Sequence, residues 1–214
     1  MKLYGYFRSS ATYRVRIALN LKGIEYESLT VDLRAPVSAQ RAPQFLALNP
    51  LGLVPVLVDG EQVLTQSLAI IEYLDETRPL PPLLPRGAAE RAQVRALALT
   101  IACEIHPLNN TGVLSYLRSP LGHDDAAVGA WYRHWIARGF TALEQQVRRL
   151  GSDGRHMFGS SVTLADVLLV PQIYNARRYQ CDLEPYPTLR AISAHLESLP
   201  AFARAAPEAQ PDCA

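Results

Sequence analysis

Four prolines within ten residues divide this chain into two parts. The stretch RPLPPLLPRG, residues 78–87, cannot form a continuous helix, because proline lacks an amide hydrogen and its ring clashes with the preceding turn. Such a stretch favours an extended connection, and a chain of 214 residues is long enough for two small domains. We therefore predict a first domain at residues 1–80, a linker at residues 81–87 and a second domain at residues 88–214.

The first part opens with the pattern of a strand, a helix and a second strand. Residues 2–7 (KLYGYF) and residues 26–33 (YESLTVDL) are typical of strands. Between them, residues 11–22 have helical periodicity, and Gly23 ends the helix. This order predicts a βαβ unit.

Two more strands and a helix follow after a polar loop. Residues 54–60 (VPVLVDG) and 62–66 (QVLTQ) are short apolar strands joined by Asp-Gly, which is a strong hairpin signal. Residues 67–76 (SLAIIEYLDE) are helical in pattern, with Ser67 placed to cap the helix. The order of elements in this half predicts one mixed sheet with helices packed on it.

Beyond the linker, almost every segment is helical in period, which predicts a helical bundle. Pro107 lies inside the first long helical run, so we expect it to leave the carbonyl of Cys103 unpaired and to bend the axis. Thr163 and Asp166, in TLAD, resemble a capping box at the start of a buried helix. The apolar residues of the first run recur at the spacing of a buried helix face: Val94, Leu97, Ala98, Ile101, Ile105 and Leu108.

Charge and hydropathy exclude several classes of protein. A formal net charge of +1 argues against nucleic acid as a partner. Arg8, Arg14 and Arg16 interrupt any apolar stretch near the N-terminus, so we expect no signal peptide. The chain also lacks the run of ~18 apolar residues that a membrane helix needs. We therefore expect a cytoplasmic protein that binds neither nucleic acid nor membrane.

The cysteines match neither a disulfide framework nor a zinc pattern. Cys103, Cys181 and Cys213 are odd in number and far apart. We expect them to be core or tail thiols, and we expect no metal.

The order of these motifs resembles the glutathione transferase superfamily. LVPVL, QSLAIIEYL, the proline-rich linker and TLAD together span essentially the whole chain. The resemblance implies an α/β thioredoxin-like N-terminal domain (βαβ-ββα) and an all-α C-terminal helical domain. RSSATYRVRIALNLKG is similar to the signature of the zeta class, which includes maleylacetoacetate isomerases and bacterial maleylpyruvate isomerases. The segments IHPLNN, VPQIYNARRYQCDLEPYP and AAPEAQPD are similar too.

Ser9 and Ser10 stand at the first turn of the first predicted helix. A helix N-terminus has unpaired N–H groups and a positive dipole end, which stabilise an anion. The resemblance implies that this anion is the thiolate of glutathione and that Ser9, with Ser10 beside it, donates a hydrogen bond to the sulfur. The alternative is an ordinary N-cap. The zeta signature usually has a cysteine after the two serines, whereas this chain has Ala11. The resemblance implies that the attacking sulfur comes from glutathione, so the serine–thiolate scheme does not need that cysteine.

Glutathione is therefore the expected cofactor. By resemblance, Pro55 is cis and the backbone of Val54 pairs with the cysteinyl part of the tripeptide like an added strand. Gln66 and Ser67 resemble the pair that binds the γ-glutamyl carboxylate, with Ser67 at a helix N-terminus. The alternative for these residues is a turn proline and a plain helix cap.

The substrates of the zeta-class isomerases are small diacids, and arginine binds both oxygens of a carboxylate. Arg8 precedes Ser9, and Arg178 resembles the carboxylate-binding arginine of the family, with Arg177 as its neighbour. His106 and either Asn109 or Asn110 are expected to donate hydrogen bonds to the substrate, and we also assign His106 and Asn110 to the glutathione site. For a lone histidine, the alternative is a surface or satisfied core residue.

The resemblance implies a glutathione-dependent cis–trans isomerase that converts maleylacetoacetate to fumarylacetoacetate by reversible thiolate addition to the conjugated double bond. Ser9, Ser10, Arg8 and Arg178 are the expected catalytic residues. Three alternatives stay open: a maleylpyruvate isomerase, a general glutathione transferase that consumes glutathione, and a non-catalytic glutathione-binding protein. Further arginine character after the two asparagines is expected of maleylpyruvate isomerases, and this chain has TG (residues 111–112) there. The resemblance also implies a homodimer.

Overall fold

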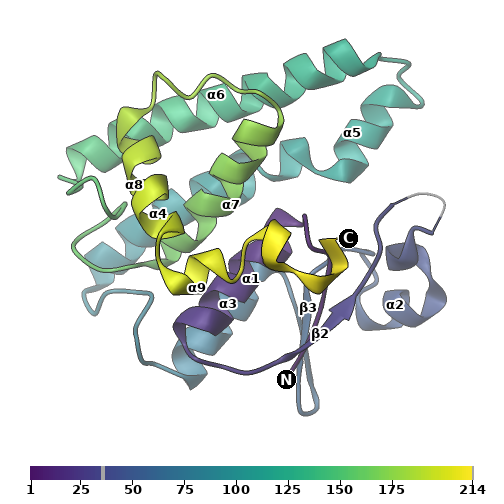
Figure 1. The fold of residues 1–214 in the computed structure, drawn as a ribbon, viewed down its shortest axis with the longest axis horizontal. Helices are drawn as coiled ribbons and strands as arrows, with labels where there is room; N and C mark the ends of the chain where they lie inside the picture. The colour runs from purple at the N-terminus through teal and green to yellow at the C-terminus, as the bar shows by residue number, and fades with distance from the viewer. Residues whose placement is uncertain (35–36, 214) are drawn as a thin grey trace. The chain divides into compact units, whose positions relative to one another are not determined.

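The computed structural model describes residues 1–34 and 37–213 and contains two compact units (Figure 1). The first unit comprises Met1–Pro82 together with Ser198–Ala214, and the second comprises Leu83–Glu197. The division between Pro82 and Leu83 lies within the proline-rich stretch. The C-terminal segment, however, belongs with the first unit, whereas the sequence predicted one helical domain over residues 88–214.

A mixed four-stranded sheet forms the centre of the first unit, in the order β2-β1-β3-β4. β1 (Lys2–Gly5) pairs in parallel with β2 (Glu27–Thr30) and antiparallel with β3 (Val56–Asp59). β3 and β4 (Gln62–Thr65) form the expected hairpin. Gly60, in its turn, has φ +60, a conformation that glycine adopts without steric cost. The predicted βαβ-ββα order is confirmed.

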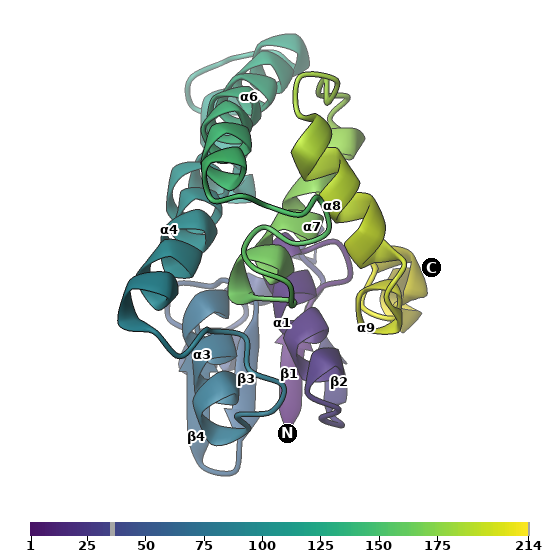
Figure 2. The same cartoon turned by 90° about the vertical axis from the view of Figure 1, so that its left-hand side faces the viewer.

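Helices cover both faces of this sheet. α1 (Ser10–Leu21) and α3 (Ser67–Thr77) pack against each other over one face (Figure 2), toward which the fully buried Leu3 and Leu57 point as a cross-strand pair. Tyr4 and Val56 point to the other face, where they pack with Phe45 of α2 (Pro43–Leu48).

The segment between β2 and β3 is not the plain polar loop that the sequence predicted. It contains a 3-10 helix, η1 (Ala39–Arg41), and the six-residue α2, which Pro43 opens at a position where its missing N–H has no cost. Phe45 is the buried residue of α2. One buried residue in fewer than two turns produces no helical periodicity, so the pattern was too short to be recognised.

The C-terminal segment joins the first unit through α1. It contains α9 (Pro200–Ala203) and the 3-10 helices η3 (Pro207–Ala209) and η4 (Pro211–Cys213), and α9 packs against α1. The Asn20 side chain donates to the Ala201 carbonyl at 2.9 Å, and Arg16 Nε donates to the Ala205 carbonyl at 2.9 Å. These bonds explain why the segment belongs to the first unit and not to the helical second unit.

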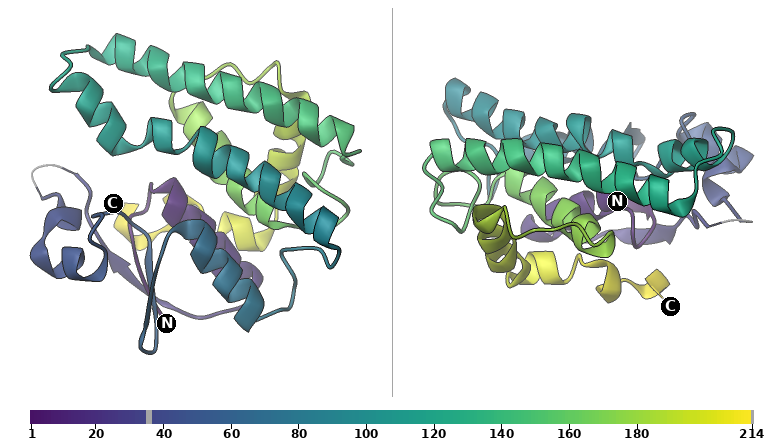
Figure 3. Two further views of the ribbon diagram at one scale, coloured as in Figure 1. Left: turned by 180° about the vertical axis from the view of Figure 1, so that it is seen from behind. Right: turned by 90° about the horizontal axis from the view of Figure 1, so that it is seen from above.

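The second unit is helical, as predicted. Its core lies among four helices: α7 packs against α4 and α8, and α6 packs against the same two (Figure 3). α5 (Thr111–Arg118) packs against α6. The four core helices are α4 (Ala88–Glu104), α6 (Asp125–Arg149), α7 (Leu164–Arg178) and α8 (Pro187–Glu197).

The prediction that Pro107 bends a continuous helix is wrong. α4 ends at Glu104, and Pro107 is the first residue of a separate 3-10 helix, η2 (Pro107–Asn109). Ending the helix avoids an unpaired carbonyl inside it, since proline is tolerated at the first helical position. Ile105 fills the break and is fully buried. Gly139 of α6 permits this, because a β-carbon there would overlap the Ile105 side chain.

The predicted capping box at the start of α7 is confirmed. Asp166 is fully buried, and its carboxylate accepts hydrogen bonds from the Thr163 N–H at 2.7 Å and the Thr163 hydroxyl at 2.8 Å. The same carboxylate accepts from the Met157 N–H at 2.7 Å. In the part of the chain that the structure describes, no helix is both long and apolar enough to cross a membrane.

Candidate active site

Ser9 is the N-cap of α1. Its Oγ accepts a hydrogen bond from the Thr12 N–H at 3.2 Å, and its own N–H donates to the Tyr6 carbonyl at 3.0 Å. The cap geometry is therefore present, but it uses only the acceptor capacity of the oxygen. The hydroxyl hydrogen can still be donated to an anion at the helix N-terminus. Ser10 is buried in the first turn.

Arg8 lies beside Ser9 with part of its guanidinium uncommitted. Its Nη2 donates to the Tyr6 hydroxyl at 3.3 Å, and its Cζ lies 5.2 Å from the centre of the Phe7 ring. Its Nε is buried and has no hydrogen-bond partner among residues 1–34 and 37–213. A buried cationic donor without an acceptor is costly unless an anion binds there.

The loop before β3 has the expected cis peptide bond between Val54 and Pro55. Buried Asn49 shapes this loop: its Nδ2 donates to the Leu53 carbonyl at 2.7 Å, and its Oδ1 accepts from the Leu51 N–H at 3.2 Å. Within the described chain, the N–H and carbonyl of Val54 bond to no other group. The Val54 backbone is therefore able to pair with an extended peptide.

The start of α3 differs in one detail from the prediction. Ser67 is the first helical residue rather than the cap, and Gln66 occupies the N-cap position without a side-chain cap bond. Gln66 has φ 68 and ψ 113, a strained conformation for a residue with a side chain, of the kind that clusters at ligand sites. The Ser67 hydroxyl accepts from Arg14 Nη1 at 3.4 Å. This contact places a buried guanidinium at the N-terminus of α3.

The turn after β1, the loop before β3 and the start of α3 meet at one end of the sheet. Tyr4 of β1 pairs with Val56 of β3, and Val56 pairs with Thr65 of β4. Because neighbouring strands here are antiparallel, the end of β1, the start of β3 and the end of β4 coincide. The predicted residues next to these strand ends are Arg8, Ser9, Ser10, Val54, Pro55, Gln66 and Ser67.

The remaining predicted residues lie in the second unit, in two places. His106 precedes the 3-10 helix η2 and Asn109 is its last residue, and Asn110 caps α5 by accepting from the Gly112 N–H at 3.0 Å. Asn109 is buried and its Nδ2 is 3.5 Å from the Tyr132 carbonyl, whereas its Oδ1 has no partner in the described residues. The amide N–H groups of Asn110 are thus better placed to donate than those of Asn109.

The two adjacent arginines at the end of α7 have different surroundings. Arg177 Nη1 donates to the Glu197 carboxylate of α8 at 2.7 Å. The Arg178 guanidinium instead lies 5.3 Å from the centre of the Tyr179 ring, and no ion pair to it is found in the described chain. Tyr179 stacks on Tyr132 with ring centres 3.5 Å apart. Burial raises the pKa of Tyr132 far above its usual range, which the nearby charge of Arg178 opposes.

Two residues of the first unit that the sequence analysis did not assign contact the predicted ones. Arg14 binds Ser67, and Arg16 Nη2 donates to the carbonyl of Phe7 at 2.9 Å. Both are almost fully buried. A charged residue on the buried face of a helix was the available signal, because such residues are rarely buried without a partner.

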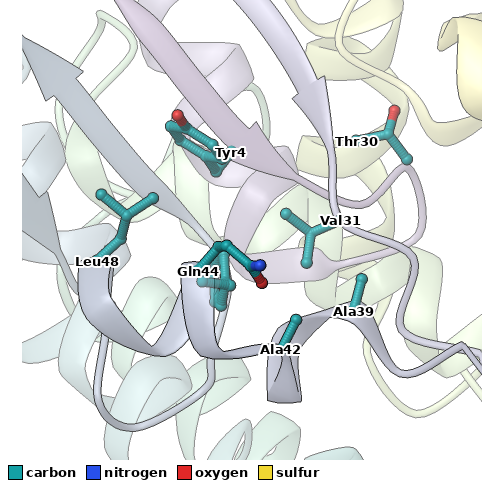
Figure 4. Close-up of a pocket in the computed structure, with 8 residues that line it drawn as sticks. Tyr4, Thr30, Val31, Ala39, Ala42, Gln44 and Leu48 are labelled. Atoms are coloured by element: carbon teal, nitrogen blue, oxygen red, sulfur yellow. The ribbon is translucent and has the colours of Figure 1, made fainter.

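A pocket of about 370 Å³ lies on the sheet face that α2 covers (Figure 4). Side chains of β1, α2 and the segment after β2 surround it, among them Tyr4, Val31 and Gln44. None of the predicted site residues lines it. Among the described residues, no cluster of His, Cys, Asp and Glu side chains suited to a metal ion is found.

Known proteins resemble this chain along its whole length. Residues 1–76 match the glutathione S-transferase N-terminal domain. The holo structure of maleylpyruvate isomerase, a bacterial zeta-class glutathione S-transferase, is 52% identical, with a TM-score of 0.97 over 100% of both chains. The chain belongs to the zeta-class glutathione transferases. The predicted thioredoxin-like and all-α halves are thus those of the glutathione transferase fold.

Other relatives carry the name of a closely related isomerase. The "Probable maleylacetoacetate isomerase" of Vibrio cholerae is 56% identical over 98% of this chain and 97% of its own length. The crystal structure of a maleylacetoacetate isomerase from Methylobacterium extorquens AM1, with bound malonate and GSH (glutathione), is 41% identical. The two structures align over 100% of both chains with a TM-score of 0.95.

Proposed function

We propose that this protein is a glutathione-dependent cis–trans isomerase of a small unsaturated diacid, and that the diacid is maleylacetoacetate, which it converts to fumarylacetoacetate. The observation that carries the proposal is one turn of chain at the N-terminus of α1. This turn holds the hydroxyl of Ser9 and, on the preceding residue, the buried Nε of Arg8, which has no hydrogen-bond partner among the described residues. A hydroxyl and a guanidinium in adjacent residues suit a thiolate and a carboxylate, respectively. The names of relatives that match along their whole length support the same reaction.

The residues at this end of the sheet fit glutathione. The N–H and carbonyl of Val54, which bond to no described group, would pair with the tripeptide backbone. Ser67 and the strained Gln66 would hold its γ-glutamyl carboxylate at the N-terminus of α3, next to the Arg14 guanidinium. When bound, glutathione supplies a thiolate that adds reversibly to the double bond and so permits rotation about it.

Ser9 would make this thiol reactive near neutral pH. A hydrogen bond from its hydroxyl and the positive end of the α1 dipole both favour the charged sulfur, so the thiol pKa falls from its usual ~8.5. Ser10, buried behind it, would support the same turn. Ala11 supplies no sulfur of its own beside the two serines, and the proposed nucleophile is the thiol of glutathione.

Arginines would hold the diacid. Arg8 and Arg178 each have donors that no described carboxylate occupies. We therefore assign these two arginines to the carboxylates of the substrate. They would also stabilise the negative charge that develops on the neighbouring carbonyl oxygen. Arg177 is paired with Glu197, so we assign it no direct role. His106 and Asn110 would donate further hydrogen bonds to glutathione or the diacid, and Asn109 would orient them.

A second candidate is maleylpyruvate isomerase. Its supporting observation is the TM-score of 0.97 to the maleylpyruvate isomerase structure over both complete chains. The uncharged Thr111 and Gly112 after the two asparagines favour maleylacetoacetate instead. We also propose that the protein is cytoplasmic and acts as a homodimer.

The test is a spectrophotometric assay of the purified protein with each diacid, with and without glutathione, while free thiol is titrated in the same samples. We expect turnover that requires glutathione and leaves its concentration unchanged, with the higher kcat/KM for maleylacetoacetate. Steady loss of thiol would indicate a conjugating transferase. Isomerisation that proceeds equally well without glutathione would contradict the proposal, as would no isomerisation of either acid.

A further inference from the structure

The turn that carries Arg8 and Ser9 is held from the other end of the chain. β1 ends at Gly5 and α1 begins at Ser10, so Phe7 lies outside both the strand and the helix. The N–H of Phe7 donates instead to Asp212 Oδ2 at 3.0 Å, across 205 positions of sequence. The Phe7 carbonyl accepts from Arg16 Nη2 at 2.9 Å. The peptide groups on both sides of Phe7 are therefore fixed by side chains.

Arg16 connects this turn to the C-terminal segment a second time. Its Nε donates to the Ala205 carbonyl at 2.9 Å while its Nη2 holds Phe7. The residue is only 2% exposed, and burial lowers the pKa of its guanidinium to about 10, which the nearby charges of Tyr26 and Asp212 oppose. The guanidinium therefore stays charged at neutral pH and keeps both bonds.

The C-terminal segment is itself fixed where it supplies these partners. α9 packs against α1 (Figure 1), and Asp212 lies within the 3-10 helix η4 rather than in a loose end. Phe7 is buried, so its N–H would have no ready replacement for the Asp212 acceptor. An unsatisfied buried N–H is unfavourable enough to displace the backbone that carries it.

We propose that Asp212, together with Arg16, is a positioning residue for the active site: it fixes Phe7 so that Arg8 and the Ser9 hydroxyl point at their ligands. The inference rests on the proposed function, in which Ser9 acts on the glutathione thiol. Asp212 itself touches no substrate. Its effect passes through the Phe7 peptide to the next two residues, at the start of α1.

The test compares Asp212→Ala with Cys213→Ala, a matched change at the next position of the same 3-10 helix. In Asp212→Ala we expect kcat to fall by about 10- to 100-fold, because small misplacement of a catalytic group has effects of this size. We also expect the pKa of the bound thiol, followed by ultraviolet absorbance against pH, to rise. Hydrogen exchange of the Phe7 amide should become faster. Asp212→Asn, which keeps an acceptor oxygen, should restore most of the turnover, and Cys213→Ala should leave all three quantities unchanged.

The proposal is overturned if folded Asp212→Ala matches Cys213→Ala in turnover, thiol pKa and Phe7 exchange. It is also overturned if the change lowers only the melting temperature, since that is a purely structural role. If Asp212→Ala does not fold, Asp212→Ser replaces it, because the serine side chain is too short to reach Phe7. A wild-type protein that isomerises neither acid would contradict the proposed function alone, and the exchange of the Phe7 amide would still test the role of Asp212.

Discussion

Ser9 combines two tasks in one hydroxyl group. Its oxygen accepts the Thr12 N–H as a helix cap, and its hydrogen remains to be donated to a ligand. The ordinary-cap interpretation and the catalytic interpretation are therefore compatible. A substitution that keeps the cap but removes the hydroxyl can separate them.

Ser9→Gly and Ser9→Ala should both lower kcat/KM by ~100-fold, the usual effect of removing one donor from a developing or bound anion. Ser9→Ala should also lower the free energy of unfolding by ~1 kcal/mol, and Ser9→Gly by only a few tenths, because glycine is an acceptable N-cap. In both variants the thiol pKa should rise, so the activity lost at neutral pH should partly return at alkaline pH. If Ser9→Ala lost activity and Ser9→Gly kept it, in parallel with their free energies of unfolding, the hydroxyl would act only as a cap.

Arg178→Ala should raise KM for the diacid by roughly 10- to 100-fold, which is the loss expected when a charged hydrogen-bond donor is removed. Arg178→Lys should recover only part of this, since an ammonium cannot bind both oxygens of a carboxylate. Arg177→Ala is the matched comparison and should give the smaller rise, because Arg177 is already paired with Glu197. Steady-state kinetics at fixed, saturating glutathione measure all three, and a larger effect at Arg177 would reverse the assignment.

How far sequence could predict this site depended on how local each contact is. The N-cap at Ser9 and the capping box at Thr163 and Asp166 join residues three apart, so the sequence displays them directly. The bond from Arg14 to Ser67 spans 53 positions, and the bond from Phe7 to Asp212 spans 205. No periodicity connects residues so distant, and only the folded chain brings them together.

At the scale of elements, prediction worked where a pattern ran over several turns and was wrong where an element was short. α2 was too short to show a period, and Pro107 ended α4 instead of bending it. The first case depends on one buried phenylalanine, and the second on a glycine of α6 that makes room for Ile105. Both are packing relations between segments, which a window of sequence does not contain.

The start of α7 should make stability depend on pH. Burial raises the pKa of Asp166 from its ordinary 3.8 to about 6, against the lowering effect of its hydrogen bonds from Met157 and Thr163. The folded state therefore holds this proton more tightly than the unfolded chain. The stabilisation is fully present below about pH 3.8 and is lost as the pH rises through about 6.

Urea unfolding of the wild type and Asp166→Asn across this range tests the point. The wild type minus variant difference in unfolding free energy should shrink from about pH 4 to pH 7, by up to about 3 kcal/mol for a shift of about two pKa units. Asparagine does not titrate, so the variant lacks this contribution. A difference that stays constant, or that grows with pH, would mean that the Asp166 carboxyl is already ionised throughout.

At the scale of the whole molecule, we expect a homodimer. Light scattering coupled to gel filtration should give twice the 23.6 kDa of one chain, at protein concentrations down to the assay range. A mass equal to one chain would remove this expectation.

Because residues 198–214 belong to the first unit, the two units complete their folding in a particular order during translation. During translation, Phe7 and Arg16 leave the ribosome long before Ala205 and Asp212 are made, so the first unit begins to form early but cannot be completed until these later residues have emerged. All residues of the second unit precede Ala205 and Asp212 in the sequence, so this unit can form before they are made. A nascent chain, or a fragment that stops after the proline-rich stretch, would therefore contain the sheet and the Ser9 turn without the acceptor that fixes Phe7. The site therefore depends on bonds to residues that are made 189 and 205 positions after their partners.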